Sequence, residues 1–151
     1  MKSKVIIWVI VGLVVGVAAV MLFKPSGGGI ANVDAAQAQK AIEAGAQVVD
    51  VRTAGEYQMG HIPGAVNAPV DQLEAAAQSW DREATYVVYC ATGSRSATAV
   101  ETMRALGFKN IAHLSAGIQS WPGKLDTGAQ TSSQKIPTSG KPVFVEFYTD
   151  S

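Results

Sequence analysis

Short strand-like runs alternate with helix-like segments between residues 34 and 114, and this alternation restricts the fold more than any other feature of the chain. The clearest strand is TYVVY, residues 85–89, which is rich in β-branched and aromatic side chains. Two further strand-like runs cover residues 47–51 and 111–114. Parallel strands joined by helical crossovers produce this order, so we predict an α/β domain built in layers.

Three helix-like segments fill the intervals, and they cover residues 34–45, 71–80 and 95–107. Asp34 is placed to cap the first helix, which ends at Gly45. Asp71, with Glu74 three residues later, resembles a capping box for the second helix. Gly107 terminates the third helix, whose apolar stripe consists of Ala97, Val100, Met103 and Leu106.

Residues 5–23 form an uninterrupted apolar segment that contains no charged side chain. As a helix this run spans roughly 28 Å, close to the ~30 Å hydrocarbon core of a bilayer. A cleaved secretory signal is the competing interpretation, but the apolar run continues past the small residues Ala18 and Ala19 to Phe23. We therefore predict an uncleaved single-pass signal-anchor at residues 1–24, with membrane contact through residues 5–23. The slight excess of positive charge before the run places the folded part outside the cytoplasm, in the periplasm if the source is bacterial.

The remaining composition predicts the domain boundaries. Residues 25–29 form a Gly-rich spacer, and residues 30–125 form the folded domain. Residues 126–140 are rich in Gly, Ser, Thr, Gln and Pro, which is typical of a linker. Residues 141–151 form a strand-like tail, KPVFVEFYTDS.

Charge and cysteine content exclude several classes of function. Between residues 30 and 125 there are seven Lys and Arg against nine Asp and Glu, so no basic face for nucleic acid is expected. The single cysteine excludes an internal disulfide and a multi-cysteine metal site, and His61 and His113 show no metal-ligand spacing. We expect no metal and no cofactor, and any cysteine chemistry depends on one thiol.

Cys90 directly follows the strand TYVVY, at the carboxyl end of a strand where ligands bind in α/β sheets. Backbone N–H groups of the following loop, and the positive end of the next helix, would stabilise an anion and lower the pKa of the thiol. Gly93 permits the backbone angle that such a loop needs, and Arg95 adds a permanent positive charge. The small side chains keep the site open, and the predicted binding residues are Ala91, Thr92, Gly93, Ser94 and Arg95. A cysteine after an apolar strand is by itself more often an inert buried residue; the loop favours a reactive thiol.

Three stretches in order resemble the rhodanese homology domain: residues 48–69, VVDVRTAGEYQMGHIPGAVNAP; residues 89–96, YCATGSRS; and residues 107–121, GFKNIAHLSAGIQSW. The resemblance covers roughly residues 30–121. It implies a three-layer α/β domain with a parallel five-stranded sheet.

The resemblance also implies a sulfurtransferase mechanism. The Cys90 thiolate would attack the outer sulfur of a small anionic donor such as thiosulfate and hold a persulfide, which passes to a thiol or cyanide acceptor. Backbone N–H groups of residues 91–95 would stabilise the persulfide, and Arg95 would hold the donor. Two departures from the family pattern are the absence of a second basic residue in the loop and Ala116, which stands where the family often has Gly.

Asp50, Arg52, Glu56 and Ser96 match family positions that we expect to support the loop. We interpret Arg52 and Glu56 as an ion pair beside the site, with a donor contact by Arg52 as a secondary role. His61, in GHIPG, is expected to form turn hydrogen bonds rather than to act as a base, because a pre-formed thiolate needs none. His113 is expected to be structural.

Three alternatives remain open. Related phosphatases and arsenate reductases use a similar loop with five residues between Cys and Arg, whereas four residues separate Cys90 from Arg95 here. A non-catalytic module could use the same fold to bind a partner or to carry a persulfide. The tail at 141–151 resembles the strand before the Cys-x-x-Cys pair of thioredoxin-like domains, which suggests a thiol redox relay with a thioredoxin-like partner.

Overall fold

The computed structural model describes residues 29–130 and residue 136. The strands are β1 (Ile30–Val33), β2 (Gln47–Asp50), β3 (Val66–Asn67), β4 (Thr85–Tyr89) and β5 (Asn110–Leu114). The helices are α2 (Ala35–Glu43), α3 (Ala54–Met59), α4 (Leu73–Ala76) and α5 (Ser94–Ala105), with short 3-10 helices η1 (Ala77–Ser79) and η2 (Ile118–Ser120). All three strands and all three helix regions expected from the sequence pattern are present.

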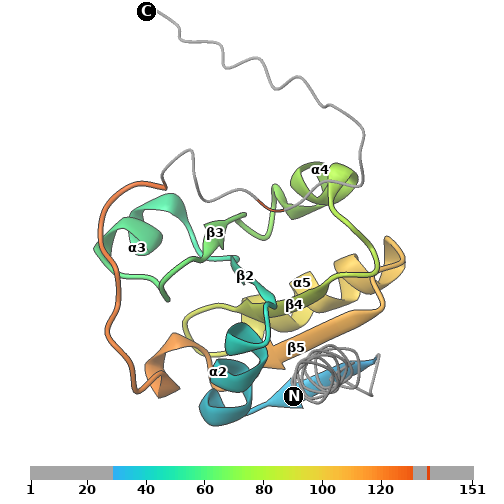
Figure 1. The fold of residues 1–151 in the computed structure, drawn as a ribbon. Helices are drawn as coiled ribbons and strands as arrows, with labels where there is room; N and C mark the ends of the chain where they lie inside the picture. Colours follow the sequence, from blue (N-terminus) through green and yellow to red (C-terminus); the bar gives the residue numbers. More distant parts are fainter. Residues whose placement is uncertain (1–28, 131–135, 137–151) are drawn as a thin grey trace, which may run out of the picture.

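The five strands form one parallel sheet in the order β1-β5-β4-β2-β3 (Figure 1). Strand β4 lies in the middle, where the run TYVVY is buried between β5 and β2. This confirms the predicted parallel five-stranded sheet. Because all strands point the same way, their carboxyl ends form one edge of the sheet, and Cys90 lies at the centre of that edge.

Helices cover both faces of the sheet and make a three-layer structure. Residues of α4, η1 and α5 pack with alternate side chains of β4 in one core cluster, which includes Leu73, Val88 and Met103. Residues of α2 and α3 pack with the other side chains of the sheet in a second cluster, which includes Ala38 and Tyr57. The alternation along β4 therefore supplies apolar side chains to both layers, as a fully buried parallel strand requires.

The helix ends follow the sequence signals in two of three cases. Asp34 caps α2 through a full capping box with Gln37, as predicted for Asp34. The capping box predicted for Asp71 and Glu74 is wrong, because a turn in which Gln72 N donates to Pro69 O delays the helix by one residue. Glu74 consequently occupies the second helical position, where it cannot complete the box.

Helix α5 ends as predicted, with Gly107 in the left-handed region at φ 89° directly after the C-cap residue Leu106. The buried face of α5 does not coincide fully with the expected apolar stripe. Val100 and Met103 are buried as predicted, whereas Ala97 is exposed. Ser96 and Ala99 complete the buried face, so a polar side chain lies inside the domain close to Cys90.

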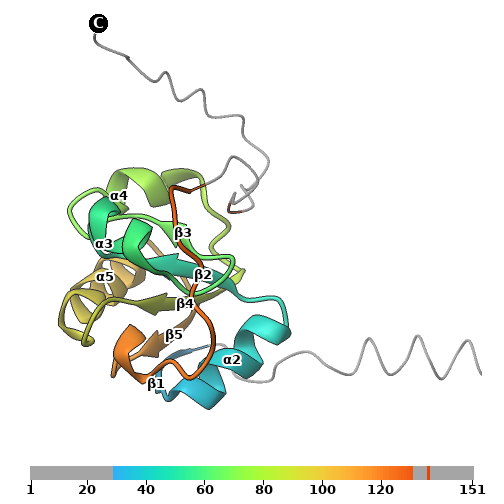
Figure 2. The same ribbon diagram turned by 90° about the vertical axis from the view of Figure 1, so that its left-hand side faces the viewer.

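The chain continues against the domain beyond the predicted domain boundary (Figure 2). Asp126 forms an antiparallel bridge with His61, and Gly128 N donates to Gln58 O at 2.9 Å. Asn67 N donates to the side chain of Gln130 at 2.9 Å, and Ile136 is buried in the core. Although the composition of this segment indicates a linker, residues 126–130 and residue 136 pack on the domain, through backbone pairing at Asp126 and Gly128, the side chain of Gln130 and the buried Ile136.

Within the described residues, no helix is long and apolar enough to cross a bilayer. The predicted anchor at residues 1–24 and the predicted tail at 141–151 lie outside those residues. Both stay predictions from the sequence.

Candidate functional site

Cys90 lies between the end of β4 and the first turn of α5, so its side chain faces the positive end of a 12-residue helix. The backbone N–H of Gly93 donates to Cys90 Sγ at 3.1 Å, and the Ser96 hydroxyl donates to the same sulfur at 3.4 Å. Gly93 is the N-cap of α5 and has no capping side chain of its own. The sulfur therefore accepts donors at the helix start, in the position of a capping group.

These donors decide the ionisation of the thiol. Burial alone raises the pKa of Cys90, but the hydrogen bonds from the Ser96 hydroxyl and from the backbone N–H groups of Ser96, Thr92 and Gly93 outweigh it. The net effect is a Cys90 pKa below its ordinary value. A lower pKa increases the thiolate fraction near neutral pH, and the thiolate is the nucleophilic form.

The thiol itself is closely covered. Cys90 exposes 1% of its surface, whereas Thr92 and Ser94 in the same loop are exposed. The short side chains that were predicted to keep the site open thus leave the outer face of the loop in contact with solvent. The sulfur of Cys90 itself stays buried.

Two glycines bring the Cys90 loop against the segment that follows β5. A Cβ atom on Gly93 would lie 1.8 Å from Ser115 O, and Gly93 adopts φ 100°. A Cβ atom on Gly117 would lie 2.3 Å from Ala91 O and 2.6 Å from Thr92 N. Both positions therefore require glycine, because backbone occupies the space that a side chain would need.

The neighbouring Ala116, which departs from the family pattern, is exposed and has an ordinary negative φ. Nothing in this backbone requires glycine there.

A chain of polar side chains runs behind the sulfur. Ser96 Oγ lies 2.8 Å from His113 Nε2, and His113 Nδ1 lies 2.9 Å from Asn32 Oδ1 on β1. Ser96 Oγ also lies 3.0 Å from Gly93 O, a second acceptor within reach of its single hydroxyl proton. Burial lowers the pKa of His113 against the opposing effect of its contact with Gly93, which favours the neutral ring. His113, predicted to be structural, thus joins β1 and β5 to the residue that contacts Sγ.

Arg95 makes a bidentate ion pair with Glu56, with nitrogen–oxygen distances of 2.8 and 2.7 Å. The predicted pairing of Glu56 with Arg52 is wrong. Glu56 lies in the first turn of α3 and faces α5, whereas the Arg52 side chain turns back into the domain. The pair connects α3 to the first turn of α5 directly beside the Cys90 loop.

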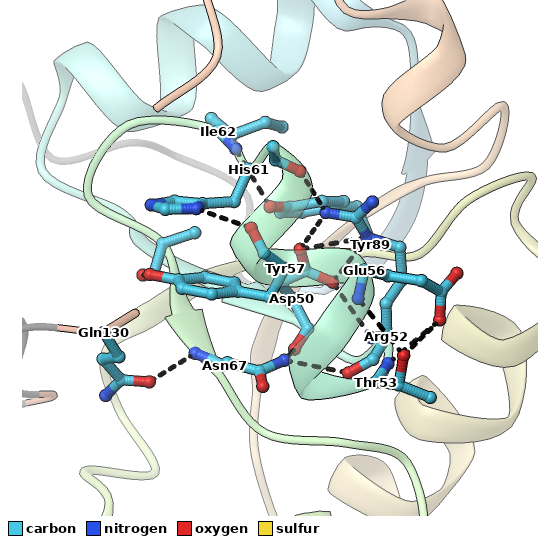
Figure 3. A network of polar contacts seen from close by, with 12 residues as sticks. Asp50, Arg52, Thr53, Glu56, Tyr57, His61, Ile62, Asn67, Tyr89 and Gln130 are labelled. Atoms are coloured by element: carbon cyan, nitrogen blue, oxygen red, sulfur yellow. Dashed lines mark hydrogen bonds and ion pairs between the residues drawn. The ribbon is translucent and has the colours of Figure 1, made fainter. Parts of the chain in front are cut away.

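Arg52 pairs with Asp50 instead, at 2.6 Å, and donates to Gly60 O (Figure 3). Both residues of this pair are buried, and the Arg52 guanidinium lies 5.7 Å from the centre of the Tyr89 ring. Asn67 donates to the carbonyl groups of Asp50 and Arg52. Nε and Nη2 of Arg52 therefore hydrogen-bond within the domain and support the segment after β2, and contact with a sulfur donor is not needed to explain this residue.

His61 has the structural contacts predicted for it. Its Nδ1 lies 2.9 Å from Tyr57 O, and its ring stacks on Tyr57 at 3.7 Å between centroids. The backbone of His61 pairs with Asp126. None of these contacts reaches Cys90.

The site thus combines residues from four elements: Cys90 after β4, Ser96 and Arg95 on α5, Glu56 on α3, and Gly117 after β5. Sequence reasoning did not single out Gly117 or Asn32. The stretch SAGIQSW was a signal for Gly117, because a glycine directly before an apolar segment indicates a close backbone approach. Asn32 has no such local signal, since its partner lies 81 residues away in the sequence.

Comparison with known proteins identifies a known domain family over most of the described residues. The family model described as the rhodanese-like domain matches residues 34–124. The putative sulfur carrier protein YrkF of Bacillus subtilis is 34% identical over 79 residues, which is 52% of this chain and 43% of YrkF. A second relative from the same organism is matched over 64% of its length, so the chain spans less than two thirds of these relatives.

Solved structures show the same fold. The rhodanese-like domain protein from Staphylococcus aureus superposes with a TM-score of 0.59 at 29% identity, covering 66% of this chain and 100% of that one. The human single-domain sulfurtransferase TSTD1 superposes with a TM-score of 0.56 at 26% identity, covering 63% and 96%.

Proposed function

The chain belongs to the rhodanese-like domain family, and from that starting point we propose that it transfers a sulfane sulfur through a persulfide on Cys90. The observation that carries this proposal is the position of Cys90 Sγ at the start of α5, where it accepts hydrogen bonds from Gly93 N and the Ser96 hydroxyl. These donors favour the thiolate, which is the attacking species.

In the first half-reaction, the Cys90 thiolate attacks the outer sulfur of a donor such as thiosulfate. A bond forms between Sγ and that sulfur, the bond from the outer sulfur to the remainder of the donor breaks, and sulfite leaves with the electron pair. The terminal sulfur of the resulting persulfide carries the negative charge. Backbone N–H groups of residues 91–95 are the groups we assign to stabilise that charge, because they surround the end of the helix.

In the second half-reaction, a thiolate or cyanide attacks the terminal sulfur of the persulfide. The sulfur–sulfur bond breaks, Cys90 leaves as the thiolate, and the product is a new persulfide or thiocyanate. The same hydrogen bonds stabilise the leaving thiolate in this step. One preformed anion site thus serves both halves of the cycle without a separate base.

The test is mass spectrometry of the intact protein after exposure to thiosulfate. We expect an addition of about 32 mass units, one sulfur, that a thiol reductant removes. Cys90→Ser should show neither the addition nor turnover with a thiol acceptor. The absence of any adduct and of any turnover that depends on Cys90 would reject the proposal.

A persulfide carrier is the second candidate, because YrkF bears the name of a putative sulfur carrier protein. A carrier and an enzyme both load Cys90. They differ in multiple turnover: the enzyme consumes many equivalents of donor per Cys90 with a small thiol, whereas the carrier stops after one. Sulfite release followed over time separates the two.

A further inference from the structure

The guanidinium of Arg95 is already occupied by a carboxylate. Two of its nitrogens each bond one oxygen of Glu56, at 2.8 and 2.7 Å. The pair is half-buried, with 37% of the Arg95 side chain and 29% of the Glu56 side chain exposed. An anionic sulfur donor approaching Arg95 therefore meets Glu56 as well.

Glu56 is held in this position from a second side. Thr53, the N-cap of α3, donates to Glu56 Oε2 from its backbone N–H at 3.1 Å and from its hydroxyl at 2.8 Å. Hydrogen bonding from Arg95, assisted by Thr53, lowers the pKa of Glu56 to about 2 against the effect of burial. Glu56 is consequently charged throughout the physiological pH range and fixed in place rather than free to swing away.

The cysteine loop has no other positive side chain. Arg95 is the only basic residue between Cys90 and Ser96. Arg52, whose guanidinium is buried, is paired with Asp50 at 2.6 Å. Hydrogen bonding and charge from Glu56 raise the pKa of Arg95. The negative charges of Cys90 and Asp50 also raise it, so all three groups act electrostatically on the Arg95 guanidinium. The side chains around the sulfur thus provide no net positive charge for a dianion.

We propose that Glu56 is a specificity-determining residue, which neutralises Arg95 and so favours monoanionic sulfur donors, of the organic persulfide and thiosulfonate class, over the thiosulfate dianion. The inference rests on the proposed function, because it concerns the donor of the same Cys90 reaction. The backbone N–H groups at the helix end still stabilise one negative charge. In the cysteine loop, whose only basic residue is Arg95, a second charge on the donor has no unpaired cation to meet.

The reaction with a thiosulfonate balances in the same way as with thiosulfate. The Cys90 thiolate bonds the outer sulfur of methanethiosulfonate, the bond between the two donor sulfurs breaks, and methanesulfinate leaves with the electron pair. One anion attacks and one anion leaves, and the persulfide carries the remaining charge. Methanethiosulfonate and thiosulfate therefore form a matched pair of donors, which differ by a methyl group in place of one charged oxygen.

The test compares these two donors on the full chain and on Glu56→Gln. Gln at this position keeps one oxygen that can accept from Thr53 and complete the capping box, while it removes the charge and one of the two acceptors that Arg95 uses. The quantity measured is the second-order rate constant of persulfide formation on Cys90, from intact mass at short times. We expect Glu56→Gln to raise the constant for thiosulfate about fivefold relative to that for methanethiosulfonate, the effect of one unit charge at several Å in a solvent-exposed site. Added salt should reduce this difference.

Glu101→Gln is the matched control, since Glu101 forms the corresponding ion pair with Arg104 on the exposed side of α5. It removes the same charge from the protein and should leave the donor ratio unchanged. An equal change for both donors in Glu56→Gln would overturn the inference, because a role limited to holding α3 against α5 affects both donors alike. A change in the ratio of the two rate constants that does not respond to added salt would also overturn the inference.

These outcomes are distinct from a failure of the proposed function. If Cys90 of the unaltered chain forms a persulfide with both donors and the ratio does not move in Glu56→Gln, only the assignment of Glu56 fails. If neither donor forms a persulfide on Cys90, the sulfurtransferase proposal fails, and the inference fails with it.

Discussion

At the scale of single residues, the chemistry of Cys90 depends on how one hydroxyl proton is shared. Ser96 has a single hydroxyl proton, and Cys90 Sγ, Gly93 O and His113 Nε2 all lie within its reach. A charged thiolate is a stronger acceptor than a carbonyl oxygen. Ionisation of Cys90 thus draws the proton toward the sulfur, and Ser96 stabilises the thiolate more than the thiol.

Ser96→Ala removes this donor, and we expect it to raise the pKa of Cys90 by about one unit, the loss of a hydrogen bond to a charged group. The sign follows from the contact, since the Ser96 hydroxyl lowers the pKa in the folded protein. The rate of alkylation by iodoacetamide, followed against pH, reports the thiolate fraction, and its midpoint should move to higher pH.

Ser94→Ala is the control for this prediction. Ser94 lies in the same turn of α5, but its side chain is exposed, and no contact with Sγ places it among the donors. The midpoint of Cys90 alkylation in Ser94→Ala should match that of the unaltered protein. An equal midpoint in Ser96→Ala would show that the backbone N–H groups alone hold the thiolate.

At the scale of elements, the site depends on the close approach of two loops at the carboxyl edge of the sheet. The loop after β4 carries Cys90, and the segment after β5 carries Gly117, whose backbone fits against Ala91. Ile118 N donates to Cys90 O at 2.9 Å, so a main-chain hydrogen bond joins the two loops. The conformation of the cysteine loop is therefore set partly by a neighbouring strand connection.

Gly117→Ala is expected to separate these loops. The added Cβ would lie 2.3 Å from Ala91 O, and backbone cannot yield as a flexible side chain does. A displacement of about 1 Å in a reacting group costs on the order of 100-fold in rate. We expect a loss of that size in the rate of persulfide formation, measured by intact mass against time.

Gly107→Ala is the control that separates the effect of backbone strain from the effect of the close contact between the two loops. Gly107 adopts φ 89°, but a Cβ atom added there would have no other atom within 4 Å, so only the left-handed conformation is penalised. That penalty is about 1–2 kcal/mol. Gly107→Ala should lower the free energy of unfolding by this amount while persulfide formation in the folded protein stays at its normal rate. If Gly117→Ala behaves in the same way, the loop contact is not needed for the reaction.

At the scale of the whole molecule, the domain includes residues beyond the part matched by the family model, which ends at 124. Asp126 pairs with His61, and Ile136 is 4% exposed in the same core cluster as Trp80 and Met103. This cluster also contains Cys90. Residues with the composition of a linker thus help to close the layer behind the site.

Ile136→Ala is expected to reduce the free energy of unfolding by about 2–5 kcal/mol, the cost of a large-to-small change in a core. Urea denaturation followed by tryptophan fluorescence measures it. Leu125→Ala is the control, because Leu125 is 43% exposed and should change stability by less than about 1 kcal/mol. Equal stability of the two variants would mean that Ile136 does not contribute to the core in solution.

The sequence by itself determined the layered α/β class, the central strand, the helix that ends at Gly107 and the position of Cys90 at the edge of the sheet. These features are local: β-branched alternation, a glycine after a helix and a cysteine after a strand are each visible within a few residues. The resemblance to rhodanese domains added the five-stranded sheet. Strands β1 and β3 had no local signal strong enough to predict, because β1 is mostly exposed and has no buried apolar run, and β3 is only two residues long.

Only the tertiary structure decided which groups meet. Glu56 is four residues from Arg52 and 39 from Arg95, yet it pairs with the distant residue because α3 turns that side chain toward α5. Asn32, His113 and Ser96 come together from three elements, and Gly117 is set against Ala91 across two loops. Arg52 pairs instead with the buried carboxylate of Asp50, two residues before it at the end of β2, and this pair offsets the cost of burying the guanidinium.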